Sequence, residues 1–180
     1  MKLGIYIGSF NPPHKGHIDV VNYLLKGKYV DRVLIVPTLG YWDKRDLVDI
    51  KHRINMLKIF ESDKIKVDTL HNEYAYTYQL MDALAKDYED ELYLIMGADN
   101  IIGFDKWKHY QKLLKYKIIV INRNGIDINK YIKKYHSNNF IVVNDYEFIK
   151  VSSSEIRDNL NNEYLDDKVL KYIKDNNLYE

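Results

Sequence analysis

Two histidines three residues apart mark the first stretch of the chain that could do chemistry. Residues 8–17 read GSFNPPHKGH, which places His14 and His17 on one face at the start of a predicted helix. Glycines at positions 8 and 16 let the backbone approach a ligand closely, and the two prolines stiffen the turn. The free N–H groups and positive end of such a helix favour an anion, usually phosphate. Either histidine alone could be a solvated surface residue, but the whole string predicts a phosphate site.

A serine-rich string near the end of the chain offers a second set of phosphate-binding groups. Residues 151–157 read VSSSEIR, in which Ser152 and Glu155 match a helix-capping box. The same geometry presents hydroxyls and free N–H groups to a phosphate chain, with Arg157 about one turn into the helix. The structural and the functional interpretation do not exclude each other.

A third group of candidate ligand-binding residues follows a predicted strand at residues 91–96. Gly97 permits a flat base to pack against backbone, and Asp99 could accept hydrogen bonds from ribose hydroxyls or cap the next short helix. Trp107 is typical of a core residue, although at the mouth of a pocket it could stack on an aromatic ring. Thr77 is most simply read as the cap of another helix.

The elements that must position these groups are strands that alternate with helices. Five short apolar runs predict strands at residues 2–7, 32–36, 91–96, 117–121 and 140–143, and the IKV string at 65–67 predicts a weaker one. Helical patterns are predicted at 18–27, 48–60, 77–88, 128–135, 154–160 and 166–176, with short helical pieces over 100–114. This alternation predicts a doubly wound parallel α/β sheet with helices on both faces. Ligands bind such sheets beyond the carboxyl ends of strands, so we expect the loops at Gly8, Pro37, Gly97 and Asn122 to share one edge with the site.

Composition restricts the class of protein. The 180 residues suit a single domain, 1–180, and the balance of 27 basic against 26 acidic residues gives no global field to attract nucleic acid or a membrane. The absence of cysteine excludes disulfides and thiolate chemistry. No secretory signal or membrane-length apolar run is present, so a cytoplasmic protein is expected. The patterns GxxxxGK[ST], GxGxxG and HExxH are absent as well, and no tightly held protein metal site is expected.

The strings GSFNPPHKGH, GADN with a following FDKW, and VSSSEIR occur in an order and spacing that resemble the HxGH-type nucleotidyltransferases, most closely the bacterial nicotinate mononucleotide adenylyltransferases. The resemblance covers nearly the whole chain, including the AYT string at 75–77, His52-Arg53 and the ending at 169–179. It implies a Rossmann-like nucleotidyltransferase fold and the transfer of AMP from ATP to the 5′-phosphate of nicotinate mononucleotide. Pyrophosphate would be released and deamido-NAD formed, a step of NAD biosynthesis, with Mg²⁺ arriving bound to ATP.

The resemblance also implies roles for individual residues. The catalytic residues would be His14, His17 and Arg157. The ATP-binding residues would be Gly8, Ser9, Phe10, His17, Gly97, Asp99, Ser153, Ser154 and Arg157. Thr77 and Trp107 would bind the acceptor, with Trp107 stacked on the pyridine ring.

One segment departs from the family. After its second strand the family usually carries a Pro-Pro-His-Lys loop, whereas residues 38–45 read TLGYWDKR here. Lys44 could replace the missing lysine as an acceptor-binding residue, and Trp42 could act as a lid aromatic. Three alternatives therefore stay open: nicotinamide mononucleotide as the acceptor, phosphopantetheine as a more remote one, and a nucleotide-binding regulator without turnover.

The expected partners are the small molecules ATP and a pyridine mononucleotide, without nucleic acid or membrane. Assembly into a homo-oligomer stays open.

Overall fold

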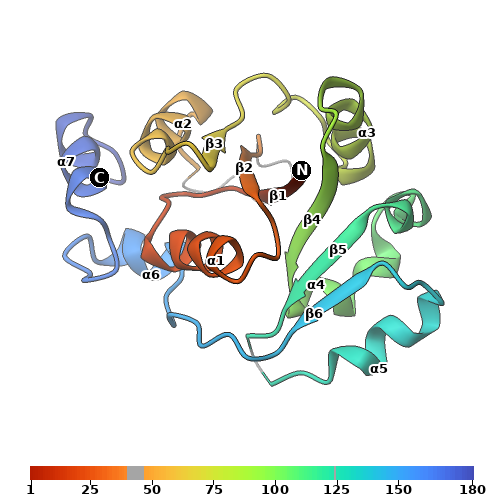
Figure 1. Ribbon diagram of the computed structural model, residues 1–180. Helices are drawn as coiled ribbons and strands as arrows, with labels where there is room; N and C mark the ends of the chain where they lie inside the picture. The colour runs from red at the N-terminus through yellow and green to blue at the C-terminus, as the bar shows by residue number, and fades with distance from the viewer. Residues whose placement is uncertain (40–46, 124) are drawn as a thin grey trace.

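A six-stranded sheet, all of whose strands run parallel, forms the centre of the protein (Figure 1). The computed structural model describes residues 1–39, 47–123 and 125–180. The strands are β1 (Lys2–Gly8), β2 (Arg32–Pro37), β3 (Ile65–Val67), β4 (Glu91–Gly97), β5 (Lys117–Ile121) and β6 (Phe140–Val143). Their order is β3-β2-β1-β4-β5-β6, so the direction of winding reverses between β1 and β4. The predicted doubly wound parallel sheet is confirmed.

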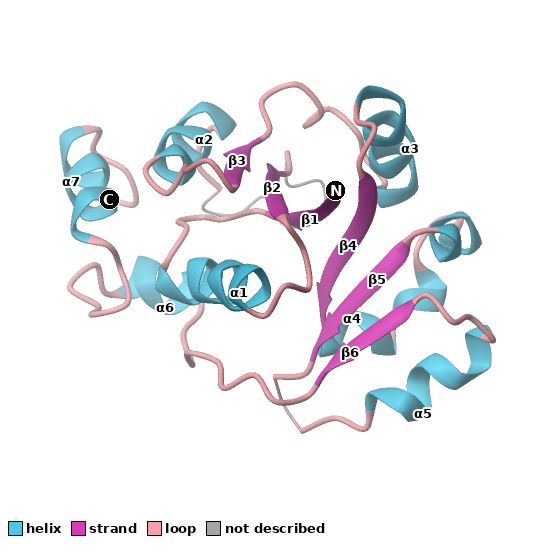
Figure 2. Cartoon of the chain, in the orientation of Figure 1, coloured by secondary structure: helices cyan, strands magenta, loops and turns pink. Residues whose placement is uncertain are grey.

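Helices cover both faces of the sheet (Figure 2). The α-helices are α1 (Lys15–Lys26), α2 (Ile50–Lys58), α3 (Thr77–Asp87), α4 (Ala98–Ile102), α5 (Ile128–Ile132), α6 (Ser153–Asp158) and α7 (Asp167–Asp175). Short 3₁₀ helices η1 (Phe104–Lys106), η2 (Tyr110–Lys115) and η3 (Lys133–Tyr135) lie among them. No helix in the described ranges has both the length and the apolar character needed to cross a membrane.

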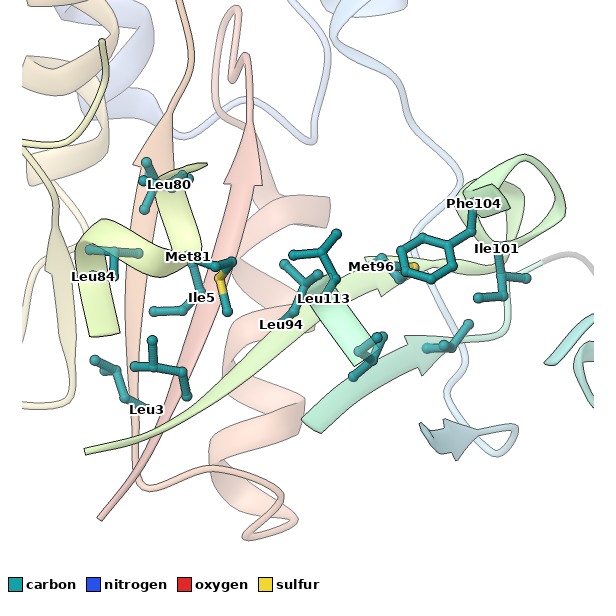
Figure 3. Packing of buried hydrophobic residues seen from close by; sticks show 14 of the residues in the cluster. Leu3, Ile5, Leu80, Met81, Leu84, Leu94, Met96, Ile101, Phe104 and Leu113 are labelled. Carbon is teal, nitrogen blue, oxygen red and sulfur yellow. The ribbon is translucent and has the colours of Figure 1, made fainter. Parts of the chain in front are cut away.

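Two hydrophobic clusters lie on opposite faces of the sheet, because successive side chains of a strand point to opposite sides. On one face, Ile5 and Leu94 pack with Met81 and Leu84 of α3 (Figure 3). On the other face, Ile35 packs with residues of α1. Burying one such side chain contributes about 1.5–3 kcal/mol to the stability of the fold. The packing on the two faces therefore fixes the sheet and, with it, the position of the loops at the ends of its strands.

A third cluster joins the end of the chain to α2. Met56 of α2 packs with Ile156 of α6 and with Val169 and Ile173 of α7. All four side chains are buried. This cluster places the start of α6 beside the loop that follows β1, although the two are more than 130 residues apart in the sequence.

Three local predictions about helices are wrong. The helical pattern at 48–60 predicts an apolar side formed by Ile50, Ile54, Leu57 and Ile59. Of these only Leu57 is buried in α2, together with Met56 and with Arg53, which finds backbone acceptors inside the protein. Thr77 does not cap α3, since the N-cap is Tyr76 and it makes no side-chain cap bond. Asp99 does not cap α4, since Gly97 occupies that position and Asp99 lies within the first turn.

Candidate active site

The loops predicted to share one edge of the sheet do lie there. Gly8 ends β1 opposite Pro37, the last residue of β2, and Gly97 ends β4 opposite Ile121, the last residue of β5. Asn122 follows β5 directly. Because β1 and β4 are the strands between which the winding reverses, their loops run in opposite directions and leave room for a ligand.

The histidine pair is fixed by the backbone at the start of α1. His14 is the N-cap, and its Nδ1 accepts a hydrogen bond from the N–H of Gly16 at 3.1 Å. The N–H of His14 in turn donates to Nδ1 of His17 at 3.1 Å. The two rings stack, with centroids 3.7 Å apart and an interplanar angle of 24°. A Cβ added at Gly16 would lie 2.9 Å from the His14 ring, so glycine at this position makes room for the stacked pair.

Both imidazoles are neutral at pH 7. Burial, together with the positive charge of Arg123, lowers the pKa of His14 to about 4. Burial, His14 and Arg123 together lower the pKa of His17 well below its usual value. A neutral imidazole carries one proton, and each Nδ1 already accepts a hydrogen bond, so the protons reside on Nε2. Within the described part of the chain neither Nε2–H has a hydrogen-bond partner, which leaves two N–H donors for a ligand.

A buried arginine, Arg53, fixes the loop after β1 through hydrogen bonds. Arg53 is 1% exposed, and its Nη1 donates to the carbonyl oxygens of Ser9 at 2.8 Å and Thr38 at 2.6 Å. Its Nε donates to the carbonyl of Val48 at 3.0 Å. These charge-assisted bonds fix the ends of β1 and β2 relative to α2. The ring of Phe10, also buried, lies edge-on to His17 with centroids 4.9 Å apart, so this predicted ATP-binding residue supports the histidine from the core side.

The start of α6 holds the same loop from the other direction. The Ser153 hydroxyl donates to the carbonyl of Pro12 at 2.9 Å, and Arg157 donates through Nη1 to the carbonyl of Asn11 at 2.8 Å. Ser152 caps the helix by accepting from the N–H of Glu155 at 3.1 Å, as its spacing predicts. The predicted N-cap at Ser152 is therefore confirmed, but the second bond of a capping box, from the Ser152 N–H to the Glu155 side chain, does not form among the described residues. The cap also brings Arg157 to the histidine loop.

A pocket of about 460 Å³ opens beside Arg157. Its lining residues are Leu47, Val48, Ser154, Arg157, Asp158, Tyr179 and Glu180. Tyr179 reaches from the end of the chain to the histidine loop, where its hydroxyl donates to Oδ1 of Asn11 at 2.6 Å. The predicted Ser154 is exposed on the wall of this pocket, whereas the hydroxyl of Ser153 is committed to the loop.

Gly97 and Asp99 lie at the end of β4, as predicted, but with an unexpected neighbour. The guanidinium of Arg123, two residues beyond β5, lies over Gly97, where an added Cβ would meet its Nη2 at 2.6 Å. The same Nη2 is 4.0 Å from Oδ1 of Asp99. Sequence reasoning missed Arg123, although its position next to Asn122, at the predicted edge, was an available signal.

The predicted acceptor-binding residues Thr77 and Trp107 come from two segments that lie side by side. Residues flanking Thr77 contact residues following Trp107: the Lys108 ammonium is 5.3 Å from the Tyr76 ring centroid, and the rings of Tyr78 and His109 are 4.9 Å apart. The half-buried indole of Trp107 packs edge-on to the buried Phe104, with centroids 5.4 Å apart. The other predicted acceptor-binding residue, Lys44, and the predicted lid aromatic, Trp42, fall outside the described residues.

Known proteins with these features form a recognisable class. A parallel sheet whose carboxyl edge carries an HxGH helix start and a serine-rich helix start defines an α/β nucleotidyltransferase. A family model described as Cytidylyltransferase-like matches residues 5–159. The chain belongs to this family.

Relatives over the whole length narrow the class to the nicotinate-nucleotide adenylyltransferases. The "Probable nicotinate-nucleotide adenylyltransferase" of Acholeplasma laidlawii is 37% identical, covering 98% of this chain and 96% of the relative. The protein of the same name from Borreliella burgdorferi is 34% identical, with 99% and 97% covered. A Plasmodium falciparum nicotinic acid mononucleotide adenylyltransferase complexed with NaAD superposes with a TM-score of 0.83 at 26% identity, covering 99% of this chain and 97% of that one.

Proposed function

We propose that this chain transfers AMP from Mg-ATP to the 5′-phosphate of nicotinate mononucleotide, with release of pyrophosphate and formation of deamido-NAD. The observation that carries the proposal is the neutral histidine pair at the start of α1, which offers two Nε2–H donors beside a helix N-terminus. The names of the full-length relatives support the choice of donor and acceptor.

The residues at this edge suit charge stabilisation. The acceptor phosphate is already a nucleophile, so the transfer needs in-line placement and neutralisation of charge. An oxygen of the acceptor phosphate forms a bond to the α-phosphorus, and the bond from that phosphorus to the bridging oxygen breaks. The electron pair of that bond leaves with pyrophosphate. The Nε2–H groups of His14 and His17 would donate to the oxygens of the α-phosphate as charge develops on them.

The remaining predicted residues suit the rest of the two substrates. Arg157 and Ser154 face the pocket of about 460 Å³ and would hold the β and γ phosphates. Asp99, exposed at the end of β4, would accept hydrogen bonds from the ribose hydroxyls of ATP. Trp107 would stack on the pyridine ring of the acceptor, with Thr77 beside it.

Magnesium fits this arrangement as a companion of ATP. The groups proposed to bind the phosphates are N–H donors, a hydroxyl and a guanidinium. Asp158 and Glu180 line the same pocket, but no cluster of three or more metal-ligating side chains lies within the described residues, so phosphate oxygens and water would supply most of the coordination. When bound, Mg²⁺ would neutralise charge on the phosphate chain. The residues of the chain would then orient the two substrates and stabilise the reacting phosphate.

An acceptor panel tests this function. The protein is mixed with Mg-ATP and, separately, with nicotinate mononucleotide, nicotinamide mononucleotide, phosphopantetheine or no acceptor, and pyrophosphate release is followed. We expect rapid release with nicotinate mononucleotide and at least tenfold slower release with each of the others. Faster release with nicotinamide mononucleotide or phosphopantetheine would reassign the acceptor. Tight ATP binding without release in any mixture would contradict catalysis and identify a nucleotide-binding regulator.

A further inference from the structure

The sheet itself places Arg123 at the edge that carries the candidate site. Arg123 follows β5, the neighbour of β4, and its guanidinium crosses the end of β4 above Gly97. The close approach depends on the missing side chain at Gly97, because an added Cβ would lie 2.6 Å from Nη2 of Arg123. The chain therefore keeps a cation in contact with the backbone where the winding of the sheet reverses.

The hydrogen-bond donors of Arg123 are uncommitted, in contrast to those of the other arginines at this edge. Arg53 donates hydrogen bonds to three carbonyl groups, and Arg157 donates to the carbonyl of Asn11. Within the described part of the chain the Arg123 guanidinium donates no hydrogen bond, and its ion pair with Asp99 spans 4.0 Å. Both side chains are partly exposed, at 38% and 65%, so this pair contributes little to stability.

The charge of Arg123 reaches the histidine pair. Its guanidinium acts on both His14 and His17, lowering the pKa of each. The cation therefore acts on two places: it lies 4.0 Å from Oδ1 of Asp99, proposed to bind the ribose, and its charge extends to the histidine pair, whose Nε2–H donors are proposed to hold the reacting phosphate. The phosphate that spans these two places in ATP is the α-phosphate, because it is esterified to O5′ of that ribose.

We propose that Arg123 binds the α-phosphate of ATP and supplies the positive charge that the neutral histidine pair does not carry. This assignment rests on the proposed adenylyl transfer. As negative charge shifts onto the oxygens of the α-phosphate and the leaving pyrophosphate, a guanidinium that donates no hydrogen bond within the described residues stabilises the transition state more than a neutral imidazole does.

Three variants test the assignment through steady-state kinetics with Mg-ATP and nicotinate mononucleotide. Arg123→Gln removes the charge, and Arg123→Lys keeps it without the planar fork. Arg32→Gln is the matched control, because Arg32 starts β2 at the amino edge and pairs with Asp90 at 2.9 Å. We expect kcat to fall about 100-fold in Arg123→Gln and about tenfold or less in Arg123→Lys. The KM for ATP should rise no more than about tenfold, and Arg32→Gln should behave as the wild type.

A binding measurement isolates the phosphate contact. The affinities of AMP and adenosine are compared within each variant by calorimetry, so that any loss of folded protein affects both ligands equally. We expect the preference for AMP over adenosine to fall about tenfold in Arg123→Gln and to stay unchanged in Arg32→Gln. An equal loss of affinity for both ligands would overturn the proposal, because it would mean that Arg123 only positions Asp99.

The kinetic outcomes separate this proposal from the proposed function. Wild-type turnover combined with an Arg123→Gln variant within twofold of it in kcat would overturn the role of Arg123 alone. A rise in KM without a loss in kcat would overturn it as well. Absence of wild-type turnover with every acceptor would instead contradict the adenylyl transfer on which the assignment rests.

Discussion

The backbone N–H of His14 donates to Nδ1 of His17 across 3.1 Å, so the first histidine of the pair fixes the orientation of the second. Since Nδ1 of His14 is itself held by Gly16, both rings present the same atom, Nε2–H, away from the helix start. The HxGH spacing therefore serves two purposes at once. It caps α1 through the Nδ1 atoms, and it leaves a pair of N–H donors for a phosphate group.

Replacing His17 separates these two purposes. We expect His17→Ala to lower turnover by about two to three orders of magnitude, the range for the loss of one transition-state donor, with a smaller effect on nucleotide binding. His17→Gln should lose turnover similarly but keep the melting temperature, because glutamine at this position can also accept from the N-cap N–H. His136→Ala, an exposed site, is the control. Normal turnover in either His17 variant would remove the imidazole from the mechanism.

Because the imidazole of His14 is buried, we expect the stability of the protein to fall at acid pH. Its pKa of about 4 lies below the usual 6.5, so between these values the unfolded chain binds more protons than the folded one and stability is lost as pH falls. His14→Asn keeps an N-cap acceptor and removes the titration. Between pH 7 and pH 5, the wild type should lose about 2 kcal/mol more of its unfolding free energy than this variant, measured by urea denaturation. Equal losses would show that His14 is not buried in the neutral form.

The contact between Tyr179 and Asn11 ties the end of the chain to the histidine loop. Tyr179→Phe removes a hydroxyl that donates to Asn11 Oδ1 at 2.6 Å, beside the Asn11 carbonyl that Arg157 holds. We expect the unfolding free energy to fall by about 1 kcal/mol and the KM for ATP to rise, because Arg157 lines the same pocket. Tyr131→Phe, whose hydroxyl has no hydrogen bond within the described residues, is the control. An unchanged KM in Tyr179→Phe would restrict the contact to folding.

The contribution of His71 to stability should depend on pH in the opposite direction to that of His14. Burial lowers the pKa of His71, but hydrogen bonds to Asp68 at 2.7 Å and Asp87 at 2.5 Å outweigh it, and the pKa is raised. The resulting stabilisation is complete below pH 6.5 and is lost as pH rises through the raised pKa. Asp87→Asn should therefore reduce the unfolding free energy more at pH 6 than at pH 9. A difference that does not depend on pH would contradict a charged imidazole in the folded protein.

Most of the sheet could be predicted because most of the strands are short, continuous apolar runs between turn residues. The runs at 65–67, 117–121 and 140–143 match β3, β5 and β6 in both bounds. The runs of β5 and β6 are apolar from residue 118 to 121 and from 140 to 143 because both faces of the sheet are covered, a property that the sequence carries locally, whereas β3 at the edge of the sheet alternates, with Lys66 exposed. Helix faces were predicted less well where a polar residue is buried, as at Arg53.

The candidate site could be predicted where its residues form strings, and only there. His14, His17 and Arg157 were identified from their local spacing. Arg123 and the link from Tyr179 to Asn11 were not, because their role depends on contacts between segments distant in sequence, such as the 168 residues that separate Tyr179 from Asn11. The burial of Arg53 likewise depends on three carbonyl groups from two connections, the one after β1 and the one between β2 and α2, which no local sequence pattern predicts.

The central claim is that AMP passes directly from ATP to an acceptor phosphate at this edge of the sheet, with the histidines as hydrogen-bond donors. The stereochemistry of the transfer tests this claim most directly. The protein is supplied with one diastereomer of adenosine 5′-O-(1-thiotriphosphate) and nicotinate mononucleotide, and the configuration at the α-phosphorus of the product is determined. The account predicts a thio-substituted deamido-NAD with inverted configuration, because a single in-line displacement inverts the phosphorus. Retention of configuration, which indicates a covalent adenylyl intermediate on the protein, or the absence of any transfer would contradict it.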